Sequence, residues 1–198
     1  MTYFRYNQAM KTIIKKRTYK AIYRLLNKVS PVDYDCGTLC NCRCCKDDDI
    51  SEDMEMGIYL MPGEEKIHNK KDPWLNWQEE LAEDYDFPDS WIGKIYFVKC
   101  TNPPNCNREM RPIQCRTFPL MPHLDEEGNL LLIETLDELP YECPLIVDKM
   151  PLNEDFVKAT YTVWKHLIRE SKIYDLIQMD SQYRDDNGIE YRVIKKDL

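Results

Sequence analysis

The sequence predicts an α+β fold: a single irregular domain organised around a cysteine-rich metal centre and flanked by N- and C-terminal helices. Three observations support this prediction. Apolar residues recur at helical spacing near both ends, shorter apolar runs with turn signals lie between them, and five of the nine cysteines fall within 36–45. With 198 residues and 43% hydrophobic residues, the chain can bury a core without disulfide staples. We expect one domain over 1–198, with a basic helix in 1–30, a cysteine-cluster core in 36–145 and a helix in 153–180.

The segment 1–30 is strongly basic. It contains eight Lys and Arg residues and no acid, so it carries +8, whereas the remainder carries −16, giving the net −8. An anionic partner, either nucleic acid or a membrane surface, would explain this charge. We favour a solvated face that pairs with the acidic body, because no aromatic-interleaved or Gly-rich nucleic-acid motif accompanies the lysines. Apolar residues at helical spacing predict an amphipathic helix docked on the domain: Ile13, Ile14, Ala21, Ile22, Leu25, Leu26 and Val29.

The central elements are expected to be short and bounded by turns. Asp72 and Pro73 have the residue types of a helix N-cap and first turn, and predict a helix through Leu81. A strand is expected at 91–98, running directly into Cys100. Two apolar runs separated by the turn 125–129 then predict a β-hairpin. Cys100 and Cys115 should therefore lie at strand ends.

The last third of the chain predicts one long amphipathic helix. Asn153 has the residue type of an N-cap, and the apolar stripe extends to Ile177. Asn187 and Gly188 should end the helix, and we expect the tail beyond them to form an edge strand or a loose end.

The cellular compartment bears on the role of the cysteines. No apolar run approaches the roughly 18 to 20 residues that span a bilayer, and the N-terminus lacks a secretory apolar region. We therefore expect a soluble, cytoplasmic protein. Because thiols stay reduced in that compartment, dense cysteines favour metal binding or catalysis over disulfides, as does their odd number.

The cysteines have the spacing of metal ligands. Cys42 and Cys45 form a Cys-x-x-Cys pair, which presents two thiolates to zinc or to an iron–sulfur cluster. The crowded segment could supply two sites or one polynuclear site, and eight thiols suffice for two four-ligand sites with one left over. Packing of free cysteines or disulfides are the alternatives, and both are poorer, because the adjacent Cys44 and Cys45 could form only a strained disulfide. The remaining cysteines are Cys36, Cys40, Cys100, Cys106, Cys115 and Cys143.

Charged residues near the cysteines are candidates for supporting roles. A thiolate cluster carries negative charge, and the arginines best placed to donate to it are Arg111 and Arg116, beside the stiffening Pro112 and Pro119. His123 could complete a site but is more readily a surface or core residue. His68 and His166 have no ligand-like neighbours. Glu64 and Glu65 are expected to be solvated loop charges, or a ligand or base if the protein is an enzyme.

Several motifs resemble the YkgJ-type cysteine-cluster family, described as a zinc- or iron-chelating domain and related to the flagellin N-methylase domain. The similar features are the segments 36–45 and 57–65, the spaced Cys100 and Cys106, "RPIQCRTFP" at 111–119, and the closing Cys143-Pro144. The chain departs from the family pattern by its extra Cys42 and by the spacing of the first cluster, which leaves open whether Cys42 or Cys44 is the matched ligand. The resemblance implies the ligand set Cys36, Cys40, Cys44, Cys45, Cys100, Cys106, Cys115 and Cys143.

Two functions follow from these observations. The first is a metal-binding protein that holds zinc or an iron–sulfur cluster through thiolates, with a chelating, sensing or structural role. The second is an iron–sulfur-dependent redox or methyl-transfer enzyme related to flagellin N-methylase. The six glycines never cluster into a phosphate-binding loop, and no serine–histidine–acid pattern stands out.

Overall fold

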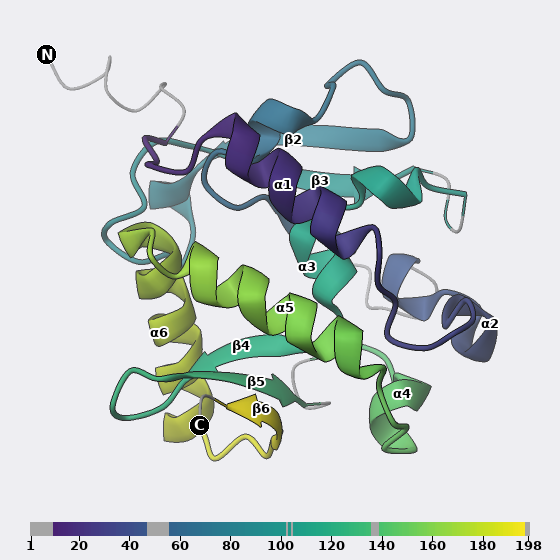
Figure 1. Cartoon of the computed structure of the whole chain (residues 1–198). Helices are drawn as coiled ribbons and strands as arrows, with labels where there is room; N and C mark the ends of the chain where they lie inside the picture. Colours follow the sequence, from purple (N-terminus) through teal and green to yellow (C-terminus); the bar gives the residue numbers. More distant parts are fainter. Residues whose placement is uncertain (1–9, 47–55, 102, 104, 136–138, 197–198) are drawn as a thin grey trace, which may run out of the picture.

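The computed structural model describes residues 10–46, 56–101, 103, 105–135 and 139–196. Helices combine with two small antiparallel sheets, which confirms the predicted α+β class. Figure 1 shows α1 and α5 crossing the front of the view, with one sheet above them and the other below. No helix in these ranges is long and apolar enough to cross a membrane. The short helical elements are α2 Gly37–Cys40, η1 Arg43–Cys45, η2 Glu64–Ile67, η3 Ala82–Asp84, η4 Arg108–Met110, α3 Ile113–Thr117 and α4 Pro144–Val147.

The predicted basic helix is present as α1, Lys16–Leu26, and it docks on the rest of the chain as expected. Its apolar face is buried against α3, α5 and η2. Tyr19, Ile22, Tyr23 and Leu26 form this face. The cations of α1 lie on the opposite, exposed side.

The first sheet corrects one prediction. It has the order β1–β3–β2, with β1 at Ile58–Tyr59, β2 at Leu75–Leu81 and β3 at Lys94–Cys100. The segment expected to be a helix from Asp72 is instead β2, which pairs with β3 along its whole length. Asp72, Pro73 and the spacing of Trp74, Trp77 and Leu81 favour a helix locally, but pairing with the distant β3 decides the outcome.

The second sheet contains the predicted hairpin. β4, Met121–Leu124, pairs with β5, Leu130–Glu134, and the C-terminal tail adds β6, Arg192–Lys196, as an edge strand. In the turn, the Asp125 carboxylate accepts hydrogen bonds from the backbone N–H groups of Glu127 (3.1 Å) and Asn129 (2.7 Å).

The predicted long C-terminal helix is divided into two helices, which is a second correction. α5 spans Glu154–Leu167 and α6 spans Ser171–Asp186, where Asn187 and Gly188 end it as expected. Between them, Glu170 is extended and buried, and its carboxylate accepts hydrogen bonds from Thr12 Oγ1 (2.9 Å) and Ile13 N (2.7 Å). The helix therefore breaks where one acid holds the segment preceding α1.

Asn153 fastens the beginning of α5 to the segment that leads into the first cysteines. Its side-chain amide donates to Ser30 O (3.1 Å) and Asp33 Oδ1 (2.9 Å), and its backbone N–H donates to Pro31 O (2.9 Å). The side chain makes no capping hydrogen bond to α5. Its amide instead bonds to residues more than a hundred positions earlier in the chain.

Glu64 lies at the centre of the fold, contrary to the expectation of a solvated loop charge. It is 1% exposed, and its carboxylate accepts hydrogen bonds from Tyr23 Oη (2.5 Å), Ile113 N (2.8 Å) and Met61 N (3.0 Å). Burial raises the pKa of Glu64, an effect that these three donors oppose. One carboxylate thus connects α1, η2 and the first turn of α3.

Removing this carboxylate should strongly destabilise the protein. Glu64→Ala removes the acceptor of two buried backbone N–H groups and of the Tyr23 hydroxyl, so we expect the free energy of unfolding to fall by about 3 kcal/mol or more. Urea unfolding measures this change, with Glu126→Ala in the exposed turn as the control. A loss as small as that of the control would show that Glu64 does not organise the fold.

The sign of the pH dependence provides a second test of the same group. Because the folded pKa of Glu64 lies above the unfolded one, its stabilising contribution is present below the unfolded pKa and is lost as the pH rises through the folded pKa. Glu64→Gln should remove this contribution, so the difference in stability between wild type and variant should shrink with rising pH. A constant difference would contradict the raised pKa.

Candidate metal centre

Five cysteines from four parts of the chain line one pocket of about 140 Å³. Cys44 and Cys45 come from η1, Cys100 ends β3, Cys106 precedes η4, and Cys115 lies in α3. The structure therefore brings together cysteines that are as much as 71 positions apart in the sequence (44 to 115). Apolar residues complete the pocket wall: Ile58, Trp74, Leu75, Val98, Phe118 and Tyr141.

The two adjacent cysteines of η1 point their sulfurs to one region. Asn41 and Cys42 both adopt left-handed backbone conformations (φ 52° and 57°), which turn the chain sharply between α2 and η1. The Sγ atoms of Cys44 and Cys45 are 3.7 Å apart. In a tetrahedral zinc site with Zn–S bonds of about 2.3 Å, neighbouring sulfurs are about 3.8 Å apart. The spacing of this pair fits two ligands of one metal ion.

Cys100 and Cys106 are held at the end of the first sheet. Cys100 pairs with Leu75 in the β2–β3 register, and the following Thr101 donates its hydroxyl to Pro73 O (2.8 Å). Arg111 Nε donates to Cys106 Sγ over 2.8 Å. Of the two arginines singled out in the sequence, Arg111 is therefore the one that contacts a sulfur.

Arg116 is placed differently. Its guanidinium donates to Asn27 Oδ1 and to Glu109 O (2.7 Å), and it lies 5.1 Å from the centroid of the Tyr23 ring. Among the described residues, its hydrogen bonds go to oxygen atoms of α1 and η4. Arg116 thus connects α3 to α1 rather than to the thiols.

Cys115 lies in a helix rather than at the end of a strand as predicted. The N-terminal residue of α3, Ile113, donates its backbone N–H to Glu64, and this bond fixes the helix that carries Cys115. Burial raises the pKa of Cys115 to about 12. The residue that donates to the buried carboxylate, Ile113, is therefore two positions before this thiol on one short helix.

A second group of cysteines adjoins the pocket. The buried Cys143 packs with Cys36 in a small apolar cluster that also contains Phe118 and Tyr141. Burial raises the pKa of Cys36, as do, to a smaller extent, the charge of Asp35 and the thiols of Cys143 and Cys40. Phe118 and Tyr141 therefore border both the pocket and the second group. Figure 1 shows α2 and α4, which follow Cys36 and Cys143, on the same side of the molecule.

An ion pair joins the early cysteine loop to the later one. Arg108 Nη1 lies 2.5 Å from Asp35 Oδ2, and Asp35 Oδ1 also accepts from Gly37 N (3.1 Å). Asp35 was not among the site residues predicted from the sequence. Its position directly before Cys36 was the available signal, because an acid beside one cysteine segment can pair with an arginine in another.

Cys42 does not belong to the residues that line the pocket, although burial and then the charges of the nearby Cys45 and Cys40 raise its pKa. Its Sγ packs against Gly37, where an added Cβ would lie only 2.5 Å from that sulfur. This contact explains why glycine suits position 37, and it gives Cys42 a packing role in the turn.

The thiols of the pocket differ in acidity. A hydrogen bond from the Cys100 thiol, and then the hydrogen bond and charge of Arg111, hold the pKa of Cys106 below its ordinary value despite burial. The pKa of Cys45 is likewise lowered, first by its bond with Cys44 and then by the charge of Arg111. The pKa of Cys44 is raised by its hydrogen bond with Cys45 and by burial. Arg111 thus favours thiolates at two places in the pocket.

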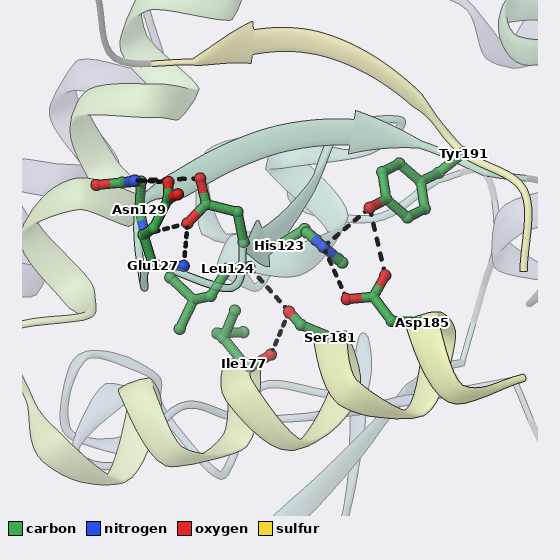
Figure 2. Close-up of polar contacts among 9 residues, drawn as sticks. His123, Leu124, Glu127, Asn129, Ile177, Ser181, Asp185 and Tyr191 are labelled. Atoms are coloured by element: carbon green, nitrogen blue, oxygen red, sulfur yellow. Dashed lines mark hydrogen bonds and ion pairs between the residues drawn. The ribbon is translucent and has the colours of Figure 1, made fainter. Parts of the chain in front are cut away.

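His123 lies outside the thiol pocket. Its side chain is 1% exposed, and its Nε2 atom lies 3.2 Å from Tyr191 Oη and 3.7 Å from Asp185 Oδ2. Figure 2 shows these contacts. In the same region, Ser181 Oγ accepts from Leu124 N (2.9 Å) and donates to Ile177 O (2.6 Å). These contacts join β4, α6 and the residue before β6, which is a core role.

The cysteines that line the pocket have the chemistry of a thiolate metal site, but the described side chains are not arranged around one point. Across the described ranges, no three His, Cys, Asp or Glu side chains form a ready metal-binding group. The sulfurs would have to close around an ion by side-chain and loop movement. The chemistry agrees, since thiolates with a nearby guanidinium donor are the ligands that zinc and iron–sulfur clusters take.

The acidity order predicts an order of reactivity. In protein stripped of metal by a chelator, Cys106 and Cys45 should react with iodoacetamide at neutral pH about tenfold faster than Cys115, because the thiolate is the nucleophile. Mass spectrometry of the peptides measures each rate. Arg111→Gln should slow Cys106 and leave Cys42 unchanged; an unaltered rate at Cys106 would contradict the role given to Arg111.

Comparison of the chain with protein-family models, with curated proteins and with solved structures finds no match in any of the three.

Proposed function

We propose that this protein binds metal through cysteine thiolates, holding zinc or an iron–sulfur cluster in a chelating, sensing or structural role. The convergence of Cys44, Cys45, Cys100, Cys106 and Cys115 on one pocket is the observation that supports this proposal. Packing alone does not require thiols from four chain segments to meet beside an arginine. The motifs that resemble the YkgJ-type family favour the same function.

The two groups of thiols suggest how the ligands divide. The pocket group contains five cysteines, and the second group contains Cys36, Cys40 and Cys143. Cys44 lies 3.7 Å from Cys45, and its pKa is affected by the charges of Cys45, Cys115 and, less, Cys36, so it lies where the two groups meet. The eight thiols other than Cys42 would suffice for two tetrahedral sites or for one polynuclear site that shares Cys44 and Cys45.

The protein's own residues would prepare the site in three ways. Arg111 favours the thiolate at Cys106 and offsets part of the negative charge that four thiolates bring. Glu64 fixes the helix of Cys115, and the Asp35–Arg108 pair holds the early loop beside the later one. When bound, the metal would supply cross-links between these segments, or electron transfer if it is an iron–sulfur cluster.

The apolar side of the pocket favours a second candidate function. Trp74, Phe118 and Tyr141 line the pocket beside the thiols. Such a wall suits a small organic substrate held next to a reactive centre. This arrangement supports an iron–sulfur-dependent redox or methyl-transfer enzyme as the alternative.

Metal content tests the proposal directly. Protein purified without oxygen should contain stoichiometric zinc and be colourless, or contain iron and sulfide and absorb visible light. Cys115→Ser and Cys45→Ser should each lose most of one metal site, whereas Cys42→Ser should retain the full amount because Cys42 lies outside the pocket. Metal-free protein with all nine thiols freely reactive would refute metal binding.

Metal removal should loosen one particular part of the chain. The elements α2 and η1 contain no buried residue, so the segment 36–45 depends on few packing contacts. We expect a chelator to increase amide hydrogen exchange there far more than in α5, which packs seven buried residues. Equal exchange in the loaded and stripped protein would show that no metal holds this segment.

A further inference from the structure

The exposed side of α1 carries a continuous stripe of positive charge. Lys16, Arg17, Lys20 and Arg24 lie on it, and Lys28 follows just beyond the helix. All five side chains are exposed, and none of them has a hydrogen bond or ion pair with any other described residue. The pairing with the acidic body that the sequence favoured is therefore not found for these cations.

The acids of the body find other partners. Glu79 binds Lys70 (2.5 Å) and Lys94 (2.6 Å), and Glu134 binds Arg192. Among the acids that the structure describes, none forms an ion pair with the stripe on α1. Maintaining like charges together on one helix face costs stability, so an external anion is the simplest reason for the arrangement.

The stripe is presented rigidly. Tyr19, Ile22 and Leu26 anchor the opposite face of α1 in the core, and Glu170 fastens the segment before it. The apolar face of this amphipathic helix is therefore already occupied by the protein, which leaves the charged face for contact with a partner.

The chemistry of this face selects among anionic partners. Tyr19 and Tyr23, the aromatic residues of α1, are 0% and 4% exposed, so neither can stack on a nucleic-acid base. Two aliphatic side chains of the same segment are exposed instead: Ile13 at 72% and Leu25 at 37%. Lysine and arginine with a few exposed aliphatic residues are the combination that peripheral proteins use at anionic lipid headgroups.

We infer that α1 is a docking surface for an anionic membrane, with the stripe of Lys16, Arg17, Lys20, Arg24 and Lys28 facing the lipid headgroups. The contact is peripheral, because the helix keeps its apolar face in the protein core. The acidic body is repelled by the same surface, so charge asymmetry orients the molecule with α1 toward the lipid. This inference is independent of the metal proposed for the thiols.

Vesicle sedimentation of the full chain tests the inference. Wild-type protein should pellet with vesicles of phosphatidylcholine and phosphatidylglycerol in equal amounts, should not pellet with phosphatidylcholine alone, and should be released by high salt. Reversing three charges in Lys16→Glu, Lys20→Glu, Arg24→Glu should weaken binding more than about tenfold. The matched control reverses three exposed lysines elsewhere, Lys71→Glu, Lys149→Glu, Lys158→Glu, and should bind within about twofold of wild type.

Additional measurements keep the result interpretable. Circular dichroism must show that both triple variants are folded, and the milder variant Leu25→Ser should reduce vesicle binding without altering the charge. Equal binding by the α1 variant and the control would overturn the inference. So would binding of a duplex or single-stranded nucleic acid in fluorescence anisotropy together with no binding to anionic vesicles.

Discussion

The placement of the thiol site depends on one buried carboxylate. Glu64 accepts hydrogen bonds from a tyrosine of α1, from its own loop and from the first residue of α3, which carries Cys115 two residues later. A buried carboxylate is stable only when donors replace the water it has lost, and the three donors meet that need. Because they belong to segments far apart in the sequence, satisfying Glu64 also fixes where those segments lie.

The rest of the centre is held less firmly. The early cysteine segment has no buried residue in α2 or η1 and is connected to the later loop by the Asp35–Arg108 pair. The late segment, by contrast, rests on the first sheet and on Glu64. A metal ion bound by cysteines of both segments would draw the loosely held early segment onto the rigid late one.

Local sequence signals correctly predicted the helices and strands whose formation depends on residues near them in the chain. The hairpin around Asp125, the basic helix and the strand that ends in Cys100 follow from turn chemistry and apolar spacing. The predictions from sequence are wrong where contacts between distant residues determine the secondary structure. β2 forms because β3 pairs with it, and the C-terminal helix breaks where Glu170 holds the segment before α1. The gathering of cysteines was predictable from their number and motifs, whereas the separate roles of Arg111, Arg116 and Glu64 depend on contacts that spacing alone does not encode.

The hydrogen bonds made by Asn153 can form only late in synthesis of the chain. The segment that leads into the first cysteines is fastened at Ser30, Pro31 and Asp33 by a residue made more than a hundred positions later. A ribosome releases the chain from its N-terminus, so the five early thiols emerge well before the residues that fix them. Until residue 153 has been made, the segment that precedes these thiols lacks its three hydrogen bonds to Asn153.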